Sequence, residues 1–410
     1  MTVYSSADRI SAFLKEIGDA PLFVCDMDGN VMTGYNLVEG AVSPFVLAAG
    51  DDPKSQSIPF GTPLQELESL VSAGIFEKGI FANKAMDVRL PQPLVDLVNQ
   101  GVEAGEPFKI AFLTSRGSAD ARKLLQESGV ENVDQVTLVA DSGATLFLNG
   151  ERKDVRTLSS GEKLHLQRVE DIGLYLRPEI ESIARDHGFD LSEPVPELYV
   201  EHKGVATNIH YREILDHFGQ AENSSFDKAV GERIKAALQA HAGAGPRVEK
   251  AKGEFSPVFK TLDGPATVEI KIADVNKGHG LAAIAEAALG DKRPPSSIVF
   301  TGDDVAKGDS PGTDYYAMAQ ARVLAVRFGI PFFNIHTHHP VDNNMSGVYP
   351  DPRKSPSGLS AAFNKPDIDL TVATPVDLQS IILRAHKKED VEITSSPRPV
   401  MIPPAAAFRS

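Results

Sequence analysis

The chain has 410 residues, of which 42% are hydrophobic and 24% are charged, and its 41 Lys and Arg against 56 Asp and Glu residues give a formal net charge of −15. This composition is typical of a globular, water-soluble protein, and the length predicts two or three domains. The acidic charge argues against nucleic acid or an anionic membrane as the main partner, because both require a basic surface. The acidic charge is compatible with a small phosphorylated substrate, since a few clustered basic residues can bind it.

Cysteine content and apolar patterning indicate the compartment. Cys25 is the one cysteine in the sequence, so no disulfide can form within the chain, and a reducing environment is the simpler interpretation. No apolar stretch reaches the roughly 18 residues of a membrane-spanning helix, and the N-terminus carries no signal-peptide pattern. We therefore expect a cytoplasmic protein, with an extended or disordered Pro- and Ser-rich tail at 391–410.

Apolar runs alternate with helical spacings along the first third of the chain. The expected strands are 22–25, the apolar part of 108–117, and a strand and hairpin over 136–150. The expected helices are 7–17, 90–105 and 118–129, the last with Ser118 as its N-cap. Strands alternating with helices predict an α/β fold, with a parallel sheet covered on both faces.

The pattern changes between about 155 and 265, where long helices are interleaved with short strand-like pieces, as in an α+β insert. Strands and helices alternate again from 266, including a buried strand at 296–304. The predicted domains are a first core segment (1–152, with an insertion near 41–87), the insert (153–266), a second core segment (267–390) and the tail (391–410).

Side chains suited to catalysis follow the ends of these predicted strands. They are Asp26 and Asp28, Thr114 to Arg116, Lys277 at the start of a helix, and Asp303 with Asp304. Ligands bind outside the carboxyl ends of strands in an open parallel sheet, so we expect these side chains to form one site. A single Asp-x-Asp-Gly more often marks a solvated turn, but four such signals together favour a site.

Phosphoryl transfer is the chemistry that these residue types favour. Carboxylates suit Mg²⁺, which would also offset the repulsion between neighbouring aspartates. Asp26 could then attack phosphorus and form an aspartyl phosphate, while Asp28 handles the proton of the leaving oxygen. Thr114 and Lys277 would bind the phosphoryl oxygens.

The motifs "DMDGN", "FLTSR", "VNKG" and "FTGDD" resemble those of the haloacid dehalogenase superfamily of aspartate-nucleophile phosphatases. The resemblance implies a Rossmann-like core, an essential Mg²⁺ and a mobile cap, which the insert would form. It implies Asp26 as nucleophile, Asp28 as general acid/base, and Thr114 and Lys277 as phosphate ligands. The metal would be held by the side chains of Asp26 and Asp303 and the main-chain carbonyl of Asp28, with Asp304 beside it.

Within that superfamily, "YVEHKGVATNIHYRE" at 199–213, "ADSGA" at 140–144 and "VEIKIADVNKGHGL" resemble trehalose-6-phosphate phosphatases. In that family an E-x-K pair contacts the sugar, which implies this role for Glu201 and Lys203. The later H-Y-R and the second motif extend the implied substrate ligands, which are Ser115, Arg116, His210 and Arg212. Residues two apart on a strand share a face, so Glu201 and Lys203 could act together, although a solvated face is the alternative.

The sequence also departs from the family pattern. Asn30 stands where the family usually has Thr, and the insertion near 41–87 adds chain beside the expected site. Eight residues separate Asp304 from the Thr-Asp pair that includes Asp314, where the family has far fewer, so the role of Asp314 stays open. His336 to His339 favour a surface loop over a transition-metal site, and Cys25 is expected to pack in the core.

The first hypothesis is therefore a Mg²⁺-dependent phosphatase acting on trehalose 6-phosphate. A second keeps the chemistry and changes the substrate to sucrose phosphate or a glycosyl-glycerate phosphate, because the inserts could change the sugar pocket. The third hypothesis is a sugar-phosphate sensor without catalysis. The presence of all four motifs argues against it. The expected partners are a small sugar phosphate and a trehalose-phosphate synthase, without nucleic acid or membrane.

Overall fold

The computed structural model describes most of the chain, with gaps. The described residues are 7–28, 30–32, 36–37, 76–77, 90–106, 109–220, 224–251, 254–264, 266–307, 310–337, 367–372 and 375–387. The predicted tail at 391–410, the loop after Thr337 and the insertion near 41–87, apart from 76–77, lie outside the described residues. Residues 36–37 and 76–77 form a two-stranded pairing of β2 (Asn36–Leu37) with β3 (Phe76–Glu77).

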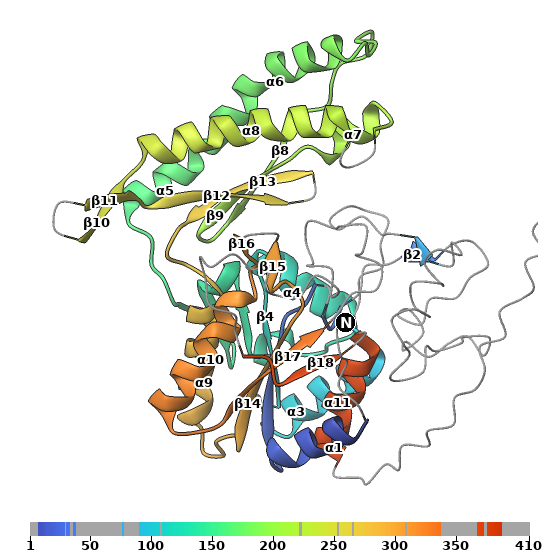
Figure 1. Cartoon of the computed structure of the whole chain (residues 1–410), viewed down its shortest axis with the longest axis vertical. Coiled ribbons are helices and arrows are strands. Elements are labelled where there is room, and N and C mark those ends of the chain that lie inside the picture. The colour runs from blue at the N-terminus through green and yellow to red at the C-terminus, as the bar shows by residue number, and fades with distance from the viewer. Residues whose placement is uncertain are drawn as a thin grey trace, which may run out of the picture.

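An eight-stranded sheet forms the core of the molecule (Figure 1). Its order is β18 (Leu370–Val372), β17 (Phe332–Thr337), β14 (Ser297–Gly302), β1 (Pro21–Cys25), β4 (Ile110–Leu113), β5 (Leu138–Ala140), β6 (Thr145–Leu148) and β7 (Glu151–Asp154). The strands from β18 to β5 pair in parallel, and β6 and β7 continue the sheet antiparallel. The carboxyl ends of the parallel strands therefore meet at one edge.

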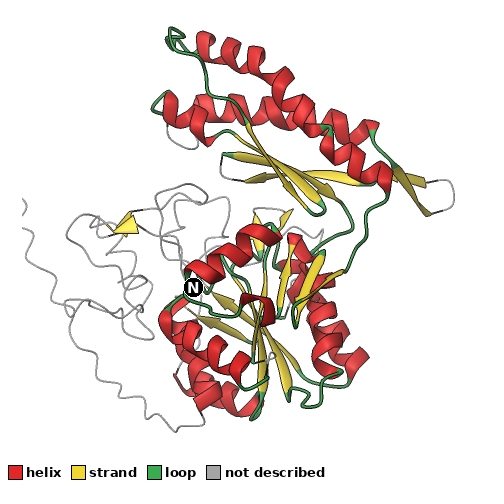
Figure 2. Ribbon diagram, turned by 180° about the vertical axis from the view of Figure 1, so that it is seen from behind, coloured by secondary structure: helices red, strands yellow, loops and turns green. Residues whose placement is uncertain are grey.

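Helices cover both faces of this sheet (Figure 2). The helices α1 (Ala7–Glu16), α3 (Gln92–Glu103), α4 (Ser118–Glu127) and α11 (Pro375–Lys387) contribute to one hydrophobic cluster with the sheet. The helices α9 (Lys277–Leu289) and α10 (Tyr315–Phe328) contribute to a second one. Alternate residues of β1 point into the two clusters, Phe23 into the first and Val24 into the second, which explains its continuous apolar sequence.

The cap is a smaller layered unit above the core (Figure 1). Its antiparallel sheet has the order β12 (Phe259–Gly264), β13 (Thr267–Ile272), β9 (Ala206–His210) and β8 (Tyr199–Lys203). The helices α5 (Ser160–Gln167), α6 (Val169–Asp186), α7 (Arg212–His217) and α8 (Ser225–Ala244) accompany it, and the hairpin β10 (Arg247–Ala251) with β11 (Glu254–Pro257) projects at one side. The apolar residues of the cap pack between its helices and one face of this sheet. The opposite face of the sheet is turned towards the core.

The predicted α/β class, with a Rossmann-like parallel core and an α+β cap, is confirmed. The division at 153–266 stays a prediction. Ser118 is not the N-cap of α4, because the helix begins at Ser118 and Gly117, which has no side chain, occupies the cap position. No described helix is long and apolar enough to cross a membrane.

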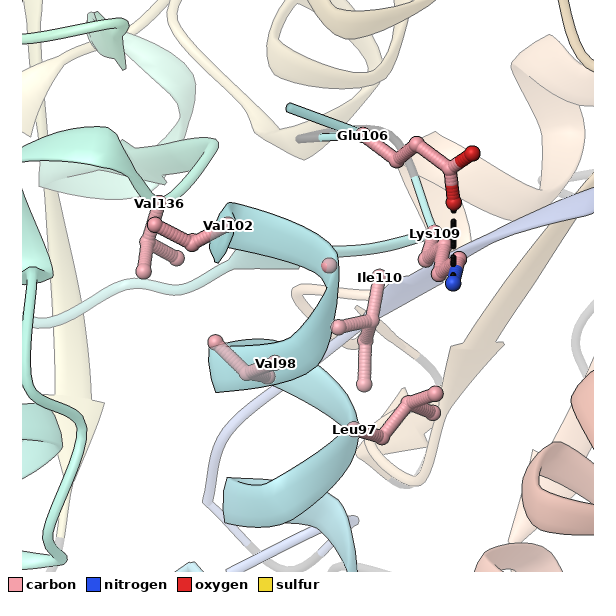
Figure 3. Close-up of a pocket in the computed structure, with 8 residues that line it drawn as sticks. Leu97, Val98, Val102, Glu106, Lys109, Ile110 and Val136 are labelled. Carbon is pink, nitrogen blue, oxygen red and sulfur yellow. Dashed lines mark ion pairs between the residues drawn. The ribbon is translucent and has the colours of Figure 1, made fainter. Parts of the chain in front are cut away.

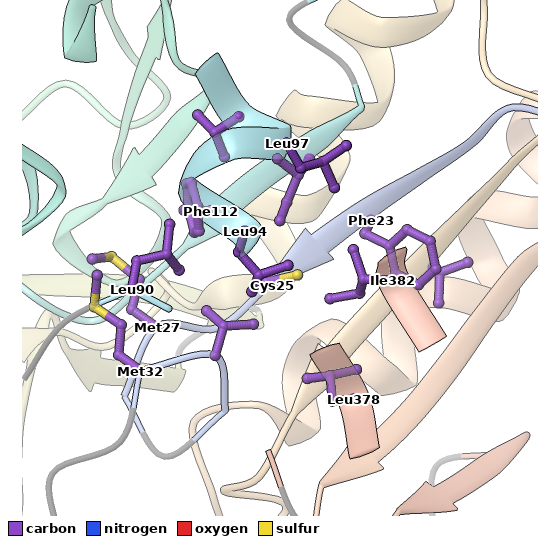
Figure 4. Close-up of a cluster of buried hydrophobic side chains, with 14 of the residues drawn as sticks. Phe23, Cys25, Met27, Met32, Leu90, Leu94, Leu97, Phe112, Leu378 and Ile382 are labelled. Carbon is purple, nitrogen blue, oxygen red and sulfur yellow. The ribbon is translucent and has the colours of Figure 1, made fainter. Parts of the chain in front are cut away.

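Cys25 lies in the first core cluster, between Phe112 and the residues of α3 and α11 (Figure 4). Its side chain is fully buried, and burial raises the pKa of the thiol to about 12. The thiol is therefore protonated at neutral pH, and its contacts agree with core packing rather than catalysis.

A small apolar cavity of about 10 Å³ lies between α3 and the start of β4 (Figure 3). Leu97, Val98 and Ile110 line it, with the Glu106–Lys109 ion pair at its rim. A space of this size holds at most one water molecule. It lies at the amino end of β4, whereas the reactive side chains follow the carboxyl ends, so it does not belong to the candidate site.

Candidate active site

Parallel strand ends and one helix start bring Asp26, Asp303 and Lys277 together. Asp26 follows β1 directly, and its N–H donates to the Thr301 carbonyl of the neighbouring β14, 3.0 Å away. Asp303 follows the end of β14. Lys277 is the first residue of α9, whose N-cap Asn276 accepts a hydrogen bond from the Gly278 N–H. These positions confirm the expected convergence of the strand ends.

A buried ion cluster forms the centre of the site. The Lys277 Nζ lies 2.8 Å from Asp26 Oδ2 and 2.6 Å from Asp314 Oδ1, and all three side chains are buried. Burial and the Asp314 carboxylate raise the pKa of Asp26 well above its usual range, and the Lys277 ammonium opposes them. Burial alone would lower the pKa of Lys277, but the two carboxylates outweigh it and raise that pKa. The lysine is therefore a permanent cation beside Asp26.

Asp314, whose role the sequence left open, belongs to this cluster. The residues between Asp304 and Asp314 include the hairpin β15 (Ala306–Lys307) and β16 (Ser310–Pro311), which returns the chain to the site. Asp314 Oδ2 accepts hydrogen bonds of 3.0 Å from the N–H groups of Asp303 and Asp304. Its carboxylate also lies directly over Gly302, where an added Cβ would come within 2.6 Å of it.

Three carboxylates of the cluster suit a hard divalent cation. Carboxylate oxygens of Asp26, Asp303 and Asp314 lie within 4.8 Å of one another, and all three residues are buried. Mg²⁺ favours oxygen ligands, and such closely spaced carboxylates repel one another unless a cation offsets their charge. Asp304 contributes differently, because its Oδ2 accepts a hydrogen bond of 2.8 Å from the Thr313 N–H.

Arg116 holds the Asp28 side chain. Its Nε lies 3.0 and 2.8 Å from the two carboxylate oxygens of Asp28, and a terminal nitrogen lies 2.7 Å from Oδ1. Another nitrogen of the same guanidinium lies 2.5 Å from Asp120 Oδ2. Burial would lower the pKa of Arg116, but these two carboxylates outweigh it and raise that pKa. The structure thus places Arg116, predicted as a substrate ligand, against the predicted acid/base residue.

The turn after β4 carries Thr114, predicted to bind phosphate, and Ser115, predicted to bind the substrate. Thr114 is buried, and its Oγ1 accepts a hydrogen bond of 3.1 Å from the Arg116 N–H. Among the described residues, the buried Ser115 Oγ has no hydrogen-bond partner, as expected of a group that meets a ligand.

Asn30, at the position where the family pattern has Thr, is fully buried and ties the loop after β1 to two neighbouring strands. It accepts a bond of 2.6 Å from Thr301 in β14 and donates one of 2.9 Å to Thr337 in β17.

Glu201, Lys203 and His210 gather on the face of the cap sheet turned towards the core. His210 Nε2 lies 2.9 Å from Glu201 Oε2, and the Lys203 Nζ lies 3.7 Å from the same oxygen. Burial opposes ionisation of Glu201, but His210, Lys203 and Asn208 outweigh it and lower its pKa. An added Cβ on Gly117 of the core would lie 3.4 Å from Lys203 and 3.6 Å from Glu201. This charged face therefore lies against the turn that carries Thr114 to Arg116.

Arg212 lies elsewhere. It is the first residue of α7, and the carboxylates that act on it are those of Asp216 and Asp227, on the helical side of the cap. Its predicted role beside Glu201 and Lys203 therefore has no support from this placement.

Comparisons with known proteins found similar solved structures but no matching sequence. No protein-family model matches the chain, and neither does any curated protein sequence. The chain is similar to the solved C-terminal domain of C. albicans trehalose-6-phosphate phosphatase, at 13% identity and a TM-score of 0.49, over 94% of this chain and 98% of that one. A structure from the family that the sequence motifs resemble is thus among those similar to this chain.

Two further solved structures are similar. One is a trehalose-6-phosphate phosphatase related protein, at 14% identity and a TM-score of 0.42, over 88% of this chain and 95% of that one. The other is the C-terminal domain of the Candida albicans trehalose synthase regulatory protein, at 10% identity and a TM-score of 0.43, over 91% and 97%. With these TM-scores and identities, neither the fold nor the activity is argued from the similar structures; both are argued from the sheet and the side chains of this chain.

Glu269 and Lys271 belong to the same charged face, and sequence reasoning missed them. Glu269 pairs in register with Asn208, which also pairs with Glu201. The three side chains therefore form a row across the neighbouring strands β13, β9 and β8. The Lys271 amine is buried, and burial lowers its pKa to about 8. The positive charges of Lys203 and Lys277 add to this lowering, and the Glu269 carboxylate opposes it. The repeat of Val-Glu-x-Lys at 200–203 and 268–271 was the available signal.

Proposed function

We propose that the chain is a Mg²⁺-dependent phosphatase that hydrolyses a sugar phosphate, trehalose 6-phosphate in the first place, through an aspartyl phosphate on Asp26. The observation that carries this proposal is the buried contact of the Lys277 ammonium with Asp26 and Asp314 at the ends of the parallel strands. A lysine in this position serves phosphoryl transfer, because it offsets charge on the phosphoryl oxygens that Asp26 approaches.

In the proposed first step, a carboxylate oxygen of Asp26 attacks phosphorus, and the bond from phosphorus to the sugar oxygen breaks. Asp28 gives its proton to that leaving oxygen. In the second step, Asp28 takes a proton from water as the water oxygen attacks phosphorus. The bond between phosphorus and the Asp26 oxygen breaks, which releases phosphate and regenerates the Asp26 carboxylate. The Arg116 guanidinium contacts both carboxylate oxygens of Asp28, which favours the ionised carboxylate that acts as base in the second step. For the first step, Arg116 would have to release one of these oxygens so that it can carry the proton.

Asp26, Asp303 and Asp314 would hold the Mg²⁺, which would supply positive charge against the phosphoryl group and the carboxylates themselves. The main-chain carbonyl of Asp28 stays part of the proposed ligand set. The close spacing of these buried carboxylates supports a cation here, because they repel one another unless positive charge offsets them.

The cap face supports a sugar as the leaving group. Glu201, Lys203, Asn208 and His210 present charged and polar groups that can bond several hydroxyls, and Glu269 with Lys271 extends that face. Such groups bind hydroxyls strongly and are left unpaired by analogues that lack them, which gives selectivity. A trehalose-phosphate synthase remains the proposed partner, since a glycosyl transfer to a sugar phosphate must supply this substrate.

A panel of phosphate esters tests the function. Purified protein in Mg²⁺ is expected to release phosphate from trehalose 6-phosphate with a kcat/KM at least about tenfold above that for sucrose 6-phosphate or glucosyl-glycerate phosphate. Chelation should remove the activity, and added Mg²⁺ should restore it. Preference for another ester would replace the substrate, and saturable binding without turnover in Mg²⁺ would indicate a sensor.

The sugar face makes a separate prediction. Glu201→Gln is expected to raise the KM for the best sugar phosphate about tenfold, because it loses the charge that binds His210, Lys203 and the substrate hydroxyls. Hydrolysis of p-nitrophenyl phosphate, which is too small to reach the face, should stay within about twofold. Glu197→Gln, at a side chain that is 77% exposed, is the control. Equal losses on both esters would contradict a sugar-binding role.

A further inference from the structure

The turn Asp141–Gly143 (η3), which follows β5, has an unusual backbone. Its three residues have positive φ angles of 55°, 58° and 102°, and only the last is a glycine. Left-handed conformations are unfavourable for residues with a side chain, and they persist where surrounding contacts fix them. The contacts of this turn therefore identify what the conformation serves.

The backbone of the turn supports both phosphate-binding elements of the core. The Asp141 N–H donates to the Arg116 carbonyl at 2.9 Å, and the Ser142 N–H donates to the Thr114 carbonyl at 3.2 Å. Gly143 lies so close to the start of α9 that an added Cβ would be 2.3 Å from the Asn276 carbonyl oxygen, next to Lys277. The turn is thus fixed between the loop that carries Thr114 and the helix that carries Lys277.

The side chain of the same Asp141 reaches the cap. Its Oδ1 accepts hydrogen bonds from the Ser118 N–H at the start of α4, at 3.3 Å, and from the Gly204 N–H in the turn between β8 and β9, at 3.2 Å. Asp141 is 2% exposed, and among the described residues its Oδ2 has no hydrogen-bond partner. An added Cβ on Gly204 would come within 2.9 Å of that oxygen, so the two turns are in close contact.

We propose that Asp141 is a positioning residue that joins the cap to the phosphate-binding loop, and that the contact seen here belongs to the closed state of the cap. Gly204 directly follows Lys203, so the hydrogen bond from its N–H fixes the end of the strand that carries Glu201 and Lys203. When the cap opens, this bond breaks, and the strained turn behind Thr114 and Arg116 loses one of the contacts that hold it. Closure of the cap on a sugar therefore favours the geometry that binds phosphate. The effect of Asp141 on catalysis rests on the proposed function, whereas its contact with Gly204 does not.

Amide hydrogen exchange of the full chain tests the contact without any substrate. Asp141→Gly removes the carboxylate and suits the positive φ, and Gly204→Ala pushes a methyl group against Asp141. In both variants, the amide hydrogens of residues 199–210 are expected to exchange about tenfold faster than in the wild type. Asp141→Asn, which keeps an acceptor oxygen and tolerates this backbone, should exchange like the wild type. Gly243→Ala, where an added Cβ meets nothing within 4 Å, is the control in the cap.

Kinetics test the consequence. Asp141→Gly and Gly204→Ala are each expected to raise the KM for the best sugar phosphate about tenfold, and the double variant no further, because both break one contact. Hydrolysis of p-nitrophenyl phosphate should change less than about twofold, whereas general damage to the fold would impair both esters. Unchanged exchange in Asp141→Gly would overturn the proposal. If the wild type hydrolyses no ester, the proposed function fails, and the exchange experiment still decides the role of Asp141.

Discussion

Asp26→Asn is expected to lower phosphate release by about 10⁴-fold or more, because an amide cannot act as the attacking carboxylate. The substitution keeps the size of the side chain and an oxygen that can accept the Met27 N–H, now 2.8 Å from Asp26 Oδ1. The Lys277 ammonium keeps its second carboxylate, Asp314, in this variant, so the folded protein should tolerate the change. Release of inorganic phosphate from the best ester of the panel is the measurement.

Two further experiments separate the role of Asp26 from a general effect of lost charge. Asp274→Asn, at a carboxylate whose side chain is 70% exposed, should retain wild-type kcat. Acid-quenched wild-type enzyme should carry a phosphoryl group on the peptide with Asp26, and the Asp26→Asn variant should carry none. Activity of that variant within tenfold of the wild type would exclude Asp26 as the nucleophile.

The sequence predicted the centre of the site because parallel sheets have a simple geometry. Once strands 22–25 and 296–304 were recognised, their carboxyl ends had to meet, and Asp26 and Asp303 with them. Lys277 was predictable for a related reason, since the sequence placed it at the start of a helix that follows a strand and loop, and helix starts of this kind face that edge. Local pattern and fold class were sufficient for these three residues.

Asp314 and Asp141 depend on contacts that sequence patterns do not encode. Asp314 comes back to the site through two strands of two residues each, which are too short to show any periodicity. The Asp-Ser-Gly sequence at 141–143 indicates a turn, but it does not predict which residues take positive φ angles or that the Asp141 side chain reaches Gly204 of the cap. Arg116 was recognised by its motif, but its pairing with Asp28 follows from how two loops meet in space.

Asp314→Asn is expected to lower kcat by about 10²-fold or more and the free energy of unfolding by about 3 kcal/mol. The Asp314 carboxylate accepts from the Lys277 ammonium on one oxygen and from the Asp303 and Asp304 N–H groups on the other. An asparagine amide has one acceptor oxygen, so its NH₂ group must face a donor on one side, and a buried donor stays unsatisfied. Steady-state kinetics and urea unfolding measure the two effects.

Asp369→Asn is the control. The Asp369 carboxylate accepts a hydrogen bond of 2.8 Å from the Asn334 N–H, and an amide oxygen can accept the same bond. Lys277→Met should lose comparable stability, since it leaves the Asp26 and Asp314 carboxylates buried without their cation. The double variant Asp314→Asn with Lys277→Met should then be more stable than the sum of the single losses predicts, because the partners are removed together. Strict additivity of the stability losses would show that Asp314 does not act through Lys277. A kcat for Asp314→Asn equal to that of Asp369→Asn would show that Asp314 does not support the reaction.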